Sequence, residues 1–239
     1  MKILSVRRGF ASDHSSTSYE FLAVDRPLGR EAREQVRALS SRTQPTKRRA
    51  SFIYHVDGYD IPGGWEQLLR DHYDVMHSES YDWWTLGFAF NAPEVQQQQI
   101  AEYEFEGDEG RGVYVSPYGD RVIVSISCQL DPEALVAFDS RFAGEFDWED
   151  EDEEEGDLDS LCEDEFLNFL AQIRRQLMDG DYRALYAVWE EYGWGDDEPT
   201  ATPDASDADE EDSLGPPVPP ARPTGGHLVE RLSGLLTTP

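Results

Sequence analysis

The sequence predicts an α+β fold with a mixed, mostly antiparallel sheet and packed helices. Two observations lead to this prediction. Segments with the two-residue apolar period of strands are mixed irregularly with segments of helical period, whereas parallel α/β proteins alternate them regularly. A β-hairpin is also evident, because residues 112–116 and 121–128 are rich in β-branched residues and flank turn-forming residues at 117–120.

The individual elements follow from local patterns. Apolar residues recur at every second position from Trp84 to Phe90, as expected for one face of a strand. Pro62 introduces a helix, and Asn91 is expected to cap another. Strands are predicted at residues 2–8, 18–24, 52–56 and 84–90, and helices at residues 29–40, 65–72, 92–103 and 131–138.

A helical hairpin is expected after residue 159. Ser160 and Glu163 have the spacing of a capping box, at the start of a helix that Gly180 ends. A second helix begins after Asp181. Two such helices cannot bury their apolar stripes alone, so the hairpin is expected to dock on the body, on a partner or on a second copy in a homo-oligomer.

Composition divides the chain into parts. Aromatic residues make up 12% of the chain and nearly all precede Trp194, so a core is expected only in the first ~190 residues. The predicted parts are an α+β body (1–144), an acidic linker (145–158), the helical hairpin (159–194), a disordered acidic and proline-rich tail (195–225) and a short amphipathic helix motif (226–237).

The net charge of −30 is concentrated in two segments. Residues 145–165 contain 14 acidic residues and no basic residue, and residues 195–239 contain ten acidic residues and two arginines, so they carry −14 and −8. This charge disfavours direct binding of nucleic acid or anionic membranes and favours a protein partner, preferably a basic one. No apolar run approaches the ~18 residues that cross a bilayer, and no secretion signal or disulfide pattern is recognised, so we expect a cytoplasmic protein.

One short motif has a counterpart elsewhere. Residues 9–19, Gly-Phe-Ala-Ser-Asp-His-Ser-Ser-Thr-Ser-Tyr, resemble a Gly-Phe-Val-Ser-Asn-polyserine-Phe motif near the N-terminus of many uncharacterised bacterial and phage proteins. This chain has Asp13-His14 where the motif has Asn-Ser. The resemblance implies a bacterial or phage origin and carries no assigned chemistry.

Three histidines lie near acidic residues and form a candidate metal site. The residues are His55, Asp57, His72 and His77, with Asp74 nearby. Such ligands suit Mn, Fe or Zn, and a metal-dependent hydrolase is therefore one functional alternative. The five-residue spacing of His72 and His77 does not suit one helical face, so the fold would have to bring them together. The other interpretation is partly exposed histidines near a sheet edge. No motif identifies a cofactor.

An aromatic segment is a candidate partner-binding site. It contains Tyr81, Trp83 and Trp84. Because neighbouring side chains on a strand point to opposite faces, one tryptophan is expected to face inward and the other outward, where it can anchor a partner or stack on a ligand. Burial of both tryptophans is the alternative.

The end of the sequence provides a second candidate partner-binding site. Leu228, Leu232 and Leu235 have helical spacing, as in a helix that docks into a partner's groove. The alternative is a frayed terminus.

A basic patch comprises Arg42, Lys47, Arg48 and Arg49. The acidic run of residues 145–159 has the opposite charge, and one hypothesis is that it folds back onto this patch and competes with whatever binds there.

These patterns contain no recognisable catalytic motif, so the leading interpretation is a non-enzymatic protein-interaction module with acidic tethers. Besides the metal-dependent hydrolase, a third interpretation is an acidic decoy that mimics nucleic acid and occupies a basic DNA-binding partner.

Overall fold

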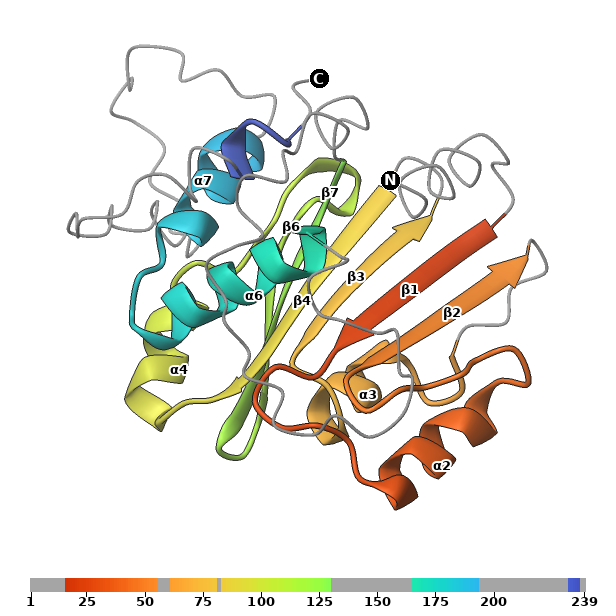
Figure 1. The fold of residues 1–239 in the computed structure, drawn as a ribbon. Coiled ribbons are helices and arrows are strands. Elements are labelled where there is room, and N and C mark those ends of the chain that lie inside the picture. The colour runs from red at the N-terminus through yellow and green to blue at the C-terminus, as the bar shows by residue number, and fades with distance from the viewer. Residues whose placement is uncertain (1–15, 56–60, 81–82, 130–164, 194–231, 237–239) are drawn as a thin grey trace, which may run out of the picture.

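The computed structural model describes residues 16–55, 61–80, 83–129, 165–193 and 232–236. Its centre is a fully antiparallel sheet of seven strands, in the order β2-β1-β3-β4-β7-β6-β5. Helices cover both faces (Figure 1), which confirms the predicted α+β class. The strands are β1 (Ser16–Leu22), β2 (Arg49–His55), β3 (Val75–Ser80), β4 (Trp83–Asn91), β5 (Phe105–Glu106), β6 (Gly112–Tyr118) and β7 (Arg121–Gln129). The helices are α2 (Arg30–Leu39), α3 (Trp65–Asp71), α4 (Glu94–Ala101), α6 (Glu165–Met178) and α7 (Arg183–Tyr192), with a 3₁₀ turn, η1, at Asp108–Gly110.

One face of the sheet packs against α6 and α7. The alternating residues Trp84, Leu86, Phe88 and Phe90 of β4 all point to this face, as the sequence pattern predicts. They form one buried cluster with apolar side chains of both helices. The helices that follow the acidic segment therefore complete the main core.

The opposite face packs against α2 and α3. Its buried cluster includes Phe21, Phe52, Leu69 and Met76. Gly87 allows α3 to approach β4 closely, because a Cβ at this position would lie 2.7 Å from Leu69 Cδ1. The protein thus has two apolar layers separated by the sheet.

Central strand β3 has no counterpart among the predicted strands. It pairs with β1 and β4 along its length. Its sequence, Val-Met-His-Ser-Glu-Ser, carries polar residues on both faces, so it lacks the apolar alternation of the other strands. The predicted hairpin is confirmed as β6 and β7, with Gly119 at a positive φ of 65° in its turn.

Strand β2 forms one edge of the sheet, and the loop that precedes it covers part of this edge. The hydroxyl of Thr43 donates to the Ser51 carbonyl at 3.1 Å, and the Thr46 amide donates to the Arg49 carbonyl at 2.9 Å. Part of the outer edge of β2 is therefore already hydrogen-bonded by the chain itself, which hinders strand addition there.

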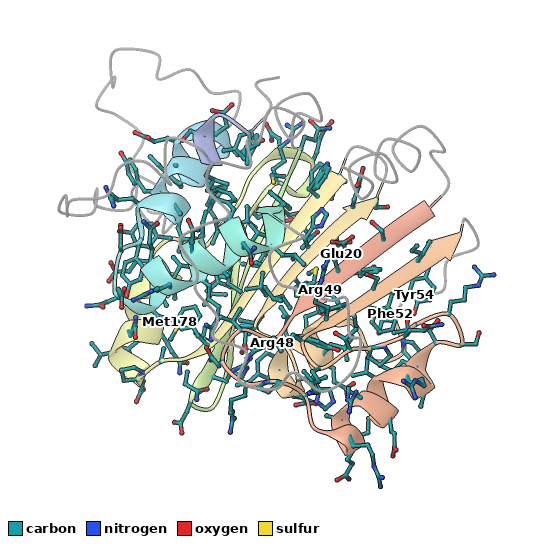
Figure 2. The ribbon with its side chains drawn as sticks, viewed as in Figure 1. Glu20, Arg48, Arg49, Phe52, Tyr54 and Met178 are labelled. Carbon is teal, nitrogen blue, oxygen red and sulfur yellow. The ribbon has the colours of Figure 1, made fainter. Side chains whose placement is uncertain are left out.

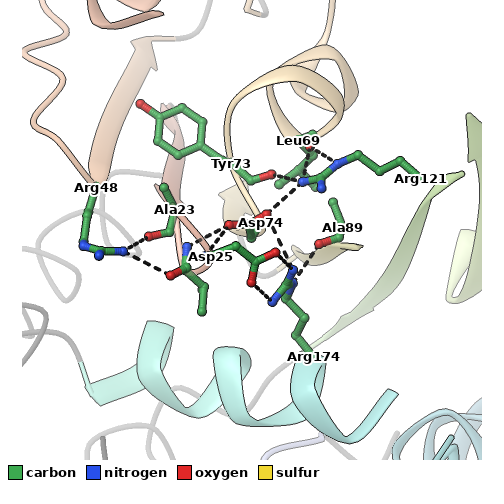
Figure 3. A network of polar contacts seen from close by, with 10 residues as sticks. Ala23, Asp25, Arg48, Leu69, Tyr73, Asp74, Ala89, Arg121 and Arg174 are labelled. Atoms are coloured by element: carbon green, nitrogen blue, oxygen red, sulfur yellow. Dashed lines mark hydrogen bonds and ion pairs between the residues drawn. The ribbon is translucent and has the colours of Figure 1, made fainter. Parts of the chain in front are cut away.

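A polar network centred on Asp74 connects the two layers (Figure 3). One Asp74 carboxylate oxygen accepts the amide hydrogens of Val24 and Asp25, at 2.8 and 2.9 Å. The other accepts from Arg121 at 2.9 Å and lies 3.6 Å from the Arg174 guanidinium. Charged groups in a low-dielectric site need such partners, so this network is structural.

Several predicted elements lie outside the described residues. They are the strand at 2–8, the helix at 131–138, the acidic linker and the tail at 195–225. In the described ranges, no helix is both long and apolar enough to span a membrane. Helix α4 begins at Glu94, and Asn91, the predicted cap, instead ends β4.

Candidate functional site

The most distinctive chemical feature of the described surface is a concentration of positive charge. Residues 26–49 contain eight of the 20 Lys and Arg residues of the chain and only two acidic residues, Glu31 and Glu34, so this segment carries +6 in a chain of −30. Five of its basic side chains are exposed and together define the basic surface: Arg26, Arg30, Arg37, Arg42 and Lys47.

Helix α2 carries two of these cations, Arg30 and Arg37, on its exposed side. Val36 is buried against the sheet, and Leu39 packs beside it. Arg30 and Arg37 lie seven residues apart, which places them on the same side of the helix, away from Val36. The amphipathic pattern of α2 thus directs its arginines to solvent.

The segments on either side of α2 are held together by backbone hydrogen bonds. The amide of Leu28 donates to the Lys47 carbonyl at 2.5 Å, and the amide of Ala23 donates to the Arg48 carbonyl at 2.7 Å. Lys47 therefore lies next to the segment that carries Arg26. A surface whose backbone is already ordered loses less entropy when it binds a partner.

The loop that carries Arg42 is also anchored. The backbone amide of Arg42 donates to the Ser40 hydroxyl at 3.3 Å. The next side chain, that of Thr43, is buried and donates a hydrogen bond to the Ser51 carbonyl of β2. Arg42 thus projects from a fixed turn at the far end of α2.

The four residues of the sequence-predicted basic patch have different roles. Arg42 and Lys47 are exposed. The guanidinium of Arg48 donates to the carbonyls of Ala23 and Val24, both at 3.0 Å. Arg49 lies beside Glu20 of β1, at 4.0 Å (Figure 2). Two of the four therefore stabilise the fold.

The sequence prediction missed the arginines of α2. Arg30 and Arg37 are seven residues apart in a segment of helical period, and this spacing was the available signal; Arg26 precedes the helix and is separated from it by residues 27–29. Arg30 lies 3.6 Å from Glu34, and both side chains are largely exposed, so water screens this pair. Within the described ranges, no carboxylate forms an ion pair with Arg26, Arg37, Arg42 or Lys47.

A cleft of about 360 Å³ lies between α2 and α3, lined by Gln35, Val36, Leu39, Pro62, Gly64, Gln67, Leu68, Asp71 and His72. Burial lowers the pKa of His72 below its ordinary value of 6.5, so its imidazole is neutral at pH 7. Asp71 accepts two hydrogen bonds from Arg70, at 2.7 and 2.8 Å, which lower the pKa of Asp71. The described lining has no Lys or Arg and no Ser, Thr or Cys, and Asp71 is its one carboxylate.

The candidate metal ligands are not gathered by the described structure. His72 lines the cleft on the α3 side of the sheet. His77 lies on the opposite face, where its ring stacks on Trp84 with 4.6 Å between centroids. Asp57 and the His55 side chain lie outside the described residues. Among the described residues, no group of three His, Cys, Asp or Glu side chains is arranged to hold a metal ion.

The two tryptophans of the aromatic segment face opposite sides of the sheet. Trp84 is buried in the main core. Trp83 is half-buried on the other face, and its indole nitrogen donates to the Ser127 hydroxyl at 2.7 Å. Tyr81 lies outside the described residues.

The leucines near the end of the sequence contact the chain's own core. Leu232 and Leu235 are 0% and 3% exposed and belong to the cluster beneath α6 and α7. Leu228 lies outside the described residues. In this arrangement the two described leucines are covered.

Comparison of the chain with protein-family models, with curated proteins and with solved structures found no match.

Proposed function

We propose that the protein is a non-enzymatic interaction module whose basic surface binds an acidic segment of a partner protein. The observation that supports the proposal is the charge of residues 26–49, which is +6 while the remainder of the chain carries −36. Acidic groups on a partner would be attracted to the basic surface and repelled by the acidic remainder of the molecule. This combination favours one binding position.

The spacing of the cations suits an extended segment. Arg30 and Arg37 are about 10 Å apart along α2, because a helix rises 1.5 Å per residue. Alternate side chains of an extended chain lie about 6.6 Å apart on one side. A segment of several acidic residues can therefore meet two or more cations at once, whereas a single carboxylate meets one.

A protein segment fits this surface better than nucleic acid does. Duplex DNA carries one charge per about 1.7 Å along a stiff rod, so it would also approach the acidic remainder of the chain. A short peptide can be confined to the basic surface. An anionic bilayer is larger than a DNA duplex, so it would also approach the acidic remainder of the chain and be repelled by it.

Fluorescence anisotropy with a labelled peptide of about twelve residues, alternating Glu with Ser and Gly, tests the proposal. We expect replacement of Arg26, Arg37, Arg42 and Lys47 by Gln (the four-site variant) to weaken binding by at least about tenfold, since each exposed pair contributes up to about 1 kcal/mol.

Single substitutions provide the matched control. Arg42→Gln should weaken peptide binding about two- to fivefold, whereas Arg175→Gln, an exposed arginine on α6, should leave the Kd unchanged. Equal affinities for the native protein and the four-site variant would refute the proposal. Tighter binding of a short DNA duplex than of the peptide, at the same salt concentration, would show that the surface serves nucleic acid instead.

A further inference from the structure

We infer that the acidic run 149–155, within the segment 145–165 of the same chain, binds the basic surface and competes there with the partner's acidic segment. This inference rests on the proposed function, because it names the regulation of the same surface. Its physical basis is charge: the segment contains 14 acidic residues and no basic residue, and the basic surface belongs to the one stretch with a net charge of +6.

The segment is joined to the described fold at both ends. Strand β7 ends at Gln129 and α6 begins at Glu165. Fifteen residues, 130–144, separate β7 from the acidic segment, and an extended chain of that length reaches about 50 Å. The second connection is shorter: nine residues, 156–164, separate the acidic run 149–155 from α6, and they extend to about 30 Å. A domain of about 140 residues has a radius of gyration of about 14 Å, so this connection is about as long as the molecule is wide and allows the run to pass around the sheet from the α6 face to the α2 face.

Attachment to the same chain strengthens a weak contact. A tethered ligand has an effective concentration on the order of 1 mM. A cis contact with an intrinsic Kd of about 0.1 mM would therefore be mostly formed, and would weaken binding of a partner peptide by about tenfold. The partner must then carry more negative charge, or an additional apolar contact, to displace the segment.

Other acidic residues are less concentrated. The run from Glu149 to Glu155 consists of seven consecutive acidic residues, which gives it the highest charge density in the chain. The acidic residues of 196–212 are interrupted by Pro, Thr, Ala and Ser. Since attraction depends on charges lying within about 8 Å at physiological ionic strength, the denser run is the stronger competitor.

The test uses two full-length variants with the same net charge. In the first, the seven residues 149–155 are changed from Glu to Gln and from Asp to Asn. In the second, seven acidic residues of the tail are changed in the same way: Asp196, Asp197, Glu198, Asp207, Asp209, Glu210 and Glu211. The labelled Glu-rich peptide is then titrated into the native protein and into each variant.

We expect the first variant to bind the peptide about tenfold more tightly than the native protein, and the second to differ from it by less than about threefold. A synthetic peptide of residues 145–165, added in trans, should displace the labelled peptide from the first variant.

The outcomes distinguish this inference from the proposed function. Equal gains in both variants would show a general charge effect and overturn the inference. No gain in the first variant, with binding still lost in the four-site variant, would overturn the inference and retain the proposed function. No peptide binding in any variant would overturn both.

Discussion

Arg174 of α6 and Asp25, just beyond β1, are 149 residues apart in sequence and form a two-contact ion pair, with Arg174 Nη1 donating to Asp25 Oδ1 at 2.8 Å. Arg174 Nε also donates to the Ala89 carbonyl at 2.7 Å. The Arg174 side chain is only 3% exposed, while that of Asp25 is 48% exposed. The arginine thus fastens the helix that follows the acidic segment to the centre of the sheet.

Arg174→Met is expected to lower the free energy of unfolding by about 3 kcal/mol. The substitution removes a buried cation that contacts Asp25, Ala89 and Asp74. The Ala89 carbonyl loses this donor, and the Asp74 carboxylate loses one of its two neighbouring cations. Urea denaturation followed by tryptophan fluorescence measures the change. The exposed neighbour Arg175→Met should change stability by no more than about 0.5 kcal/mol, and equal effects of the two substitutions would contradict the assigned role of Arg174.

His72 is expected to make the fold less stable as the pH falls from 7. Burial lowers the pKa of His72 in the folded protein, so the unfolded chain binds a proton first, near pH 6.5. The contribution is complete above pH 6.5 and is lost as the pH falls toward the folded-state pKa. Urea midpoints between pH 7.5 and 5 test this, and His72→Gln should show a smaller decrease than the native protein; an unchanged pH dependence would contradict the burial of this imidazole.

Cys128 is expected to resist alkylation in the folded protein. Its side chain is fully buried in β7, and burial raises the pKa of the thiol to about 12, so little reactive thiolate forms at mildly alkaline pH. Iodoacetamide followed by peptide mass spectrometry separates Cys128 from Cys162. Modification of Cys128 should require urea, and rapid modification of the native protein would show that this part of the core opens.

The sequence predicted the elements whose side chains follow a simple period. The β6–β7 hairpin and the alternation from Trp84 to Phe90 are confirmed by the register of the sheet. Strand β3 was missed because two of its polar residues, His77 and Glu79, are buried on the sheet face that packs against α6. Tertiary neighbours, including the Trp84 ring on His77, decide the placement of this strand, and no local pattern contains that information.

The candidate site was predicted only in part. Arg42 and Lys47 were identified from a local run of basic residues. The structural use of Arg48 depends on the Ala23 and Val24 carbonyls, about 24 residues away, which the sequence alone does not place nearby. Arg26 joins the surface because of the backbone pairing between Leu28 and Lys47, which is likewise a tertiary contact.

The dependence of peptide affinity on salt concentration tests the central claim most directly. The Glu-rich peptide is titrated into the native protein and the four-site variant, at about 50 mM and about 300 mM NaCl, over which screening shortens the range of charge interactions. The native protein is predicted to lose affinity by at least about tenfold, and the four-site variant by less than about threefold. Equal salt dependence of the two proteins would contradict binding at the basic surface.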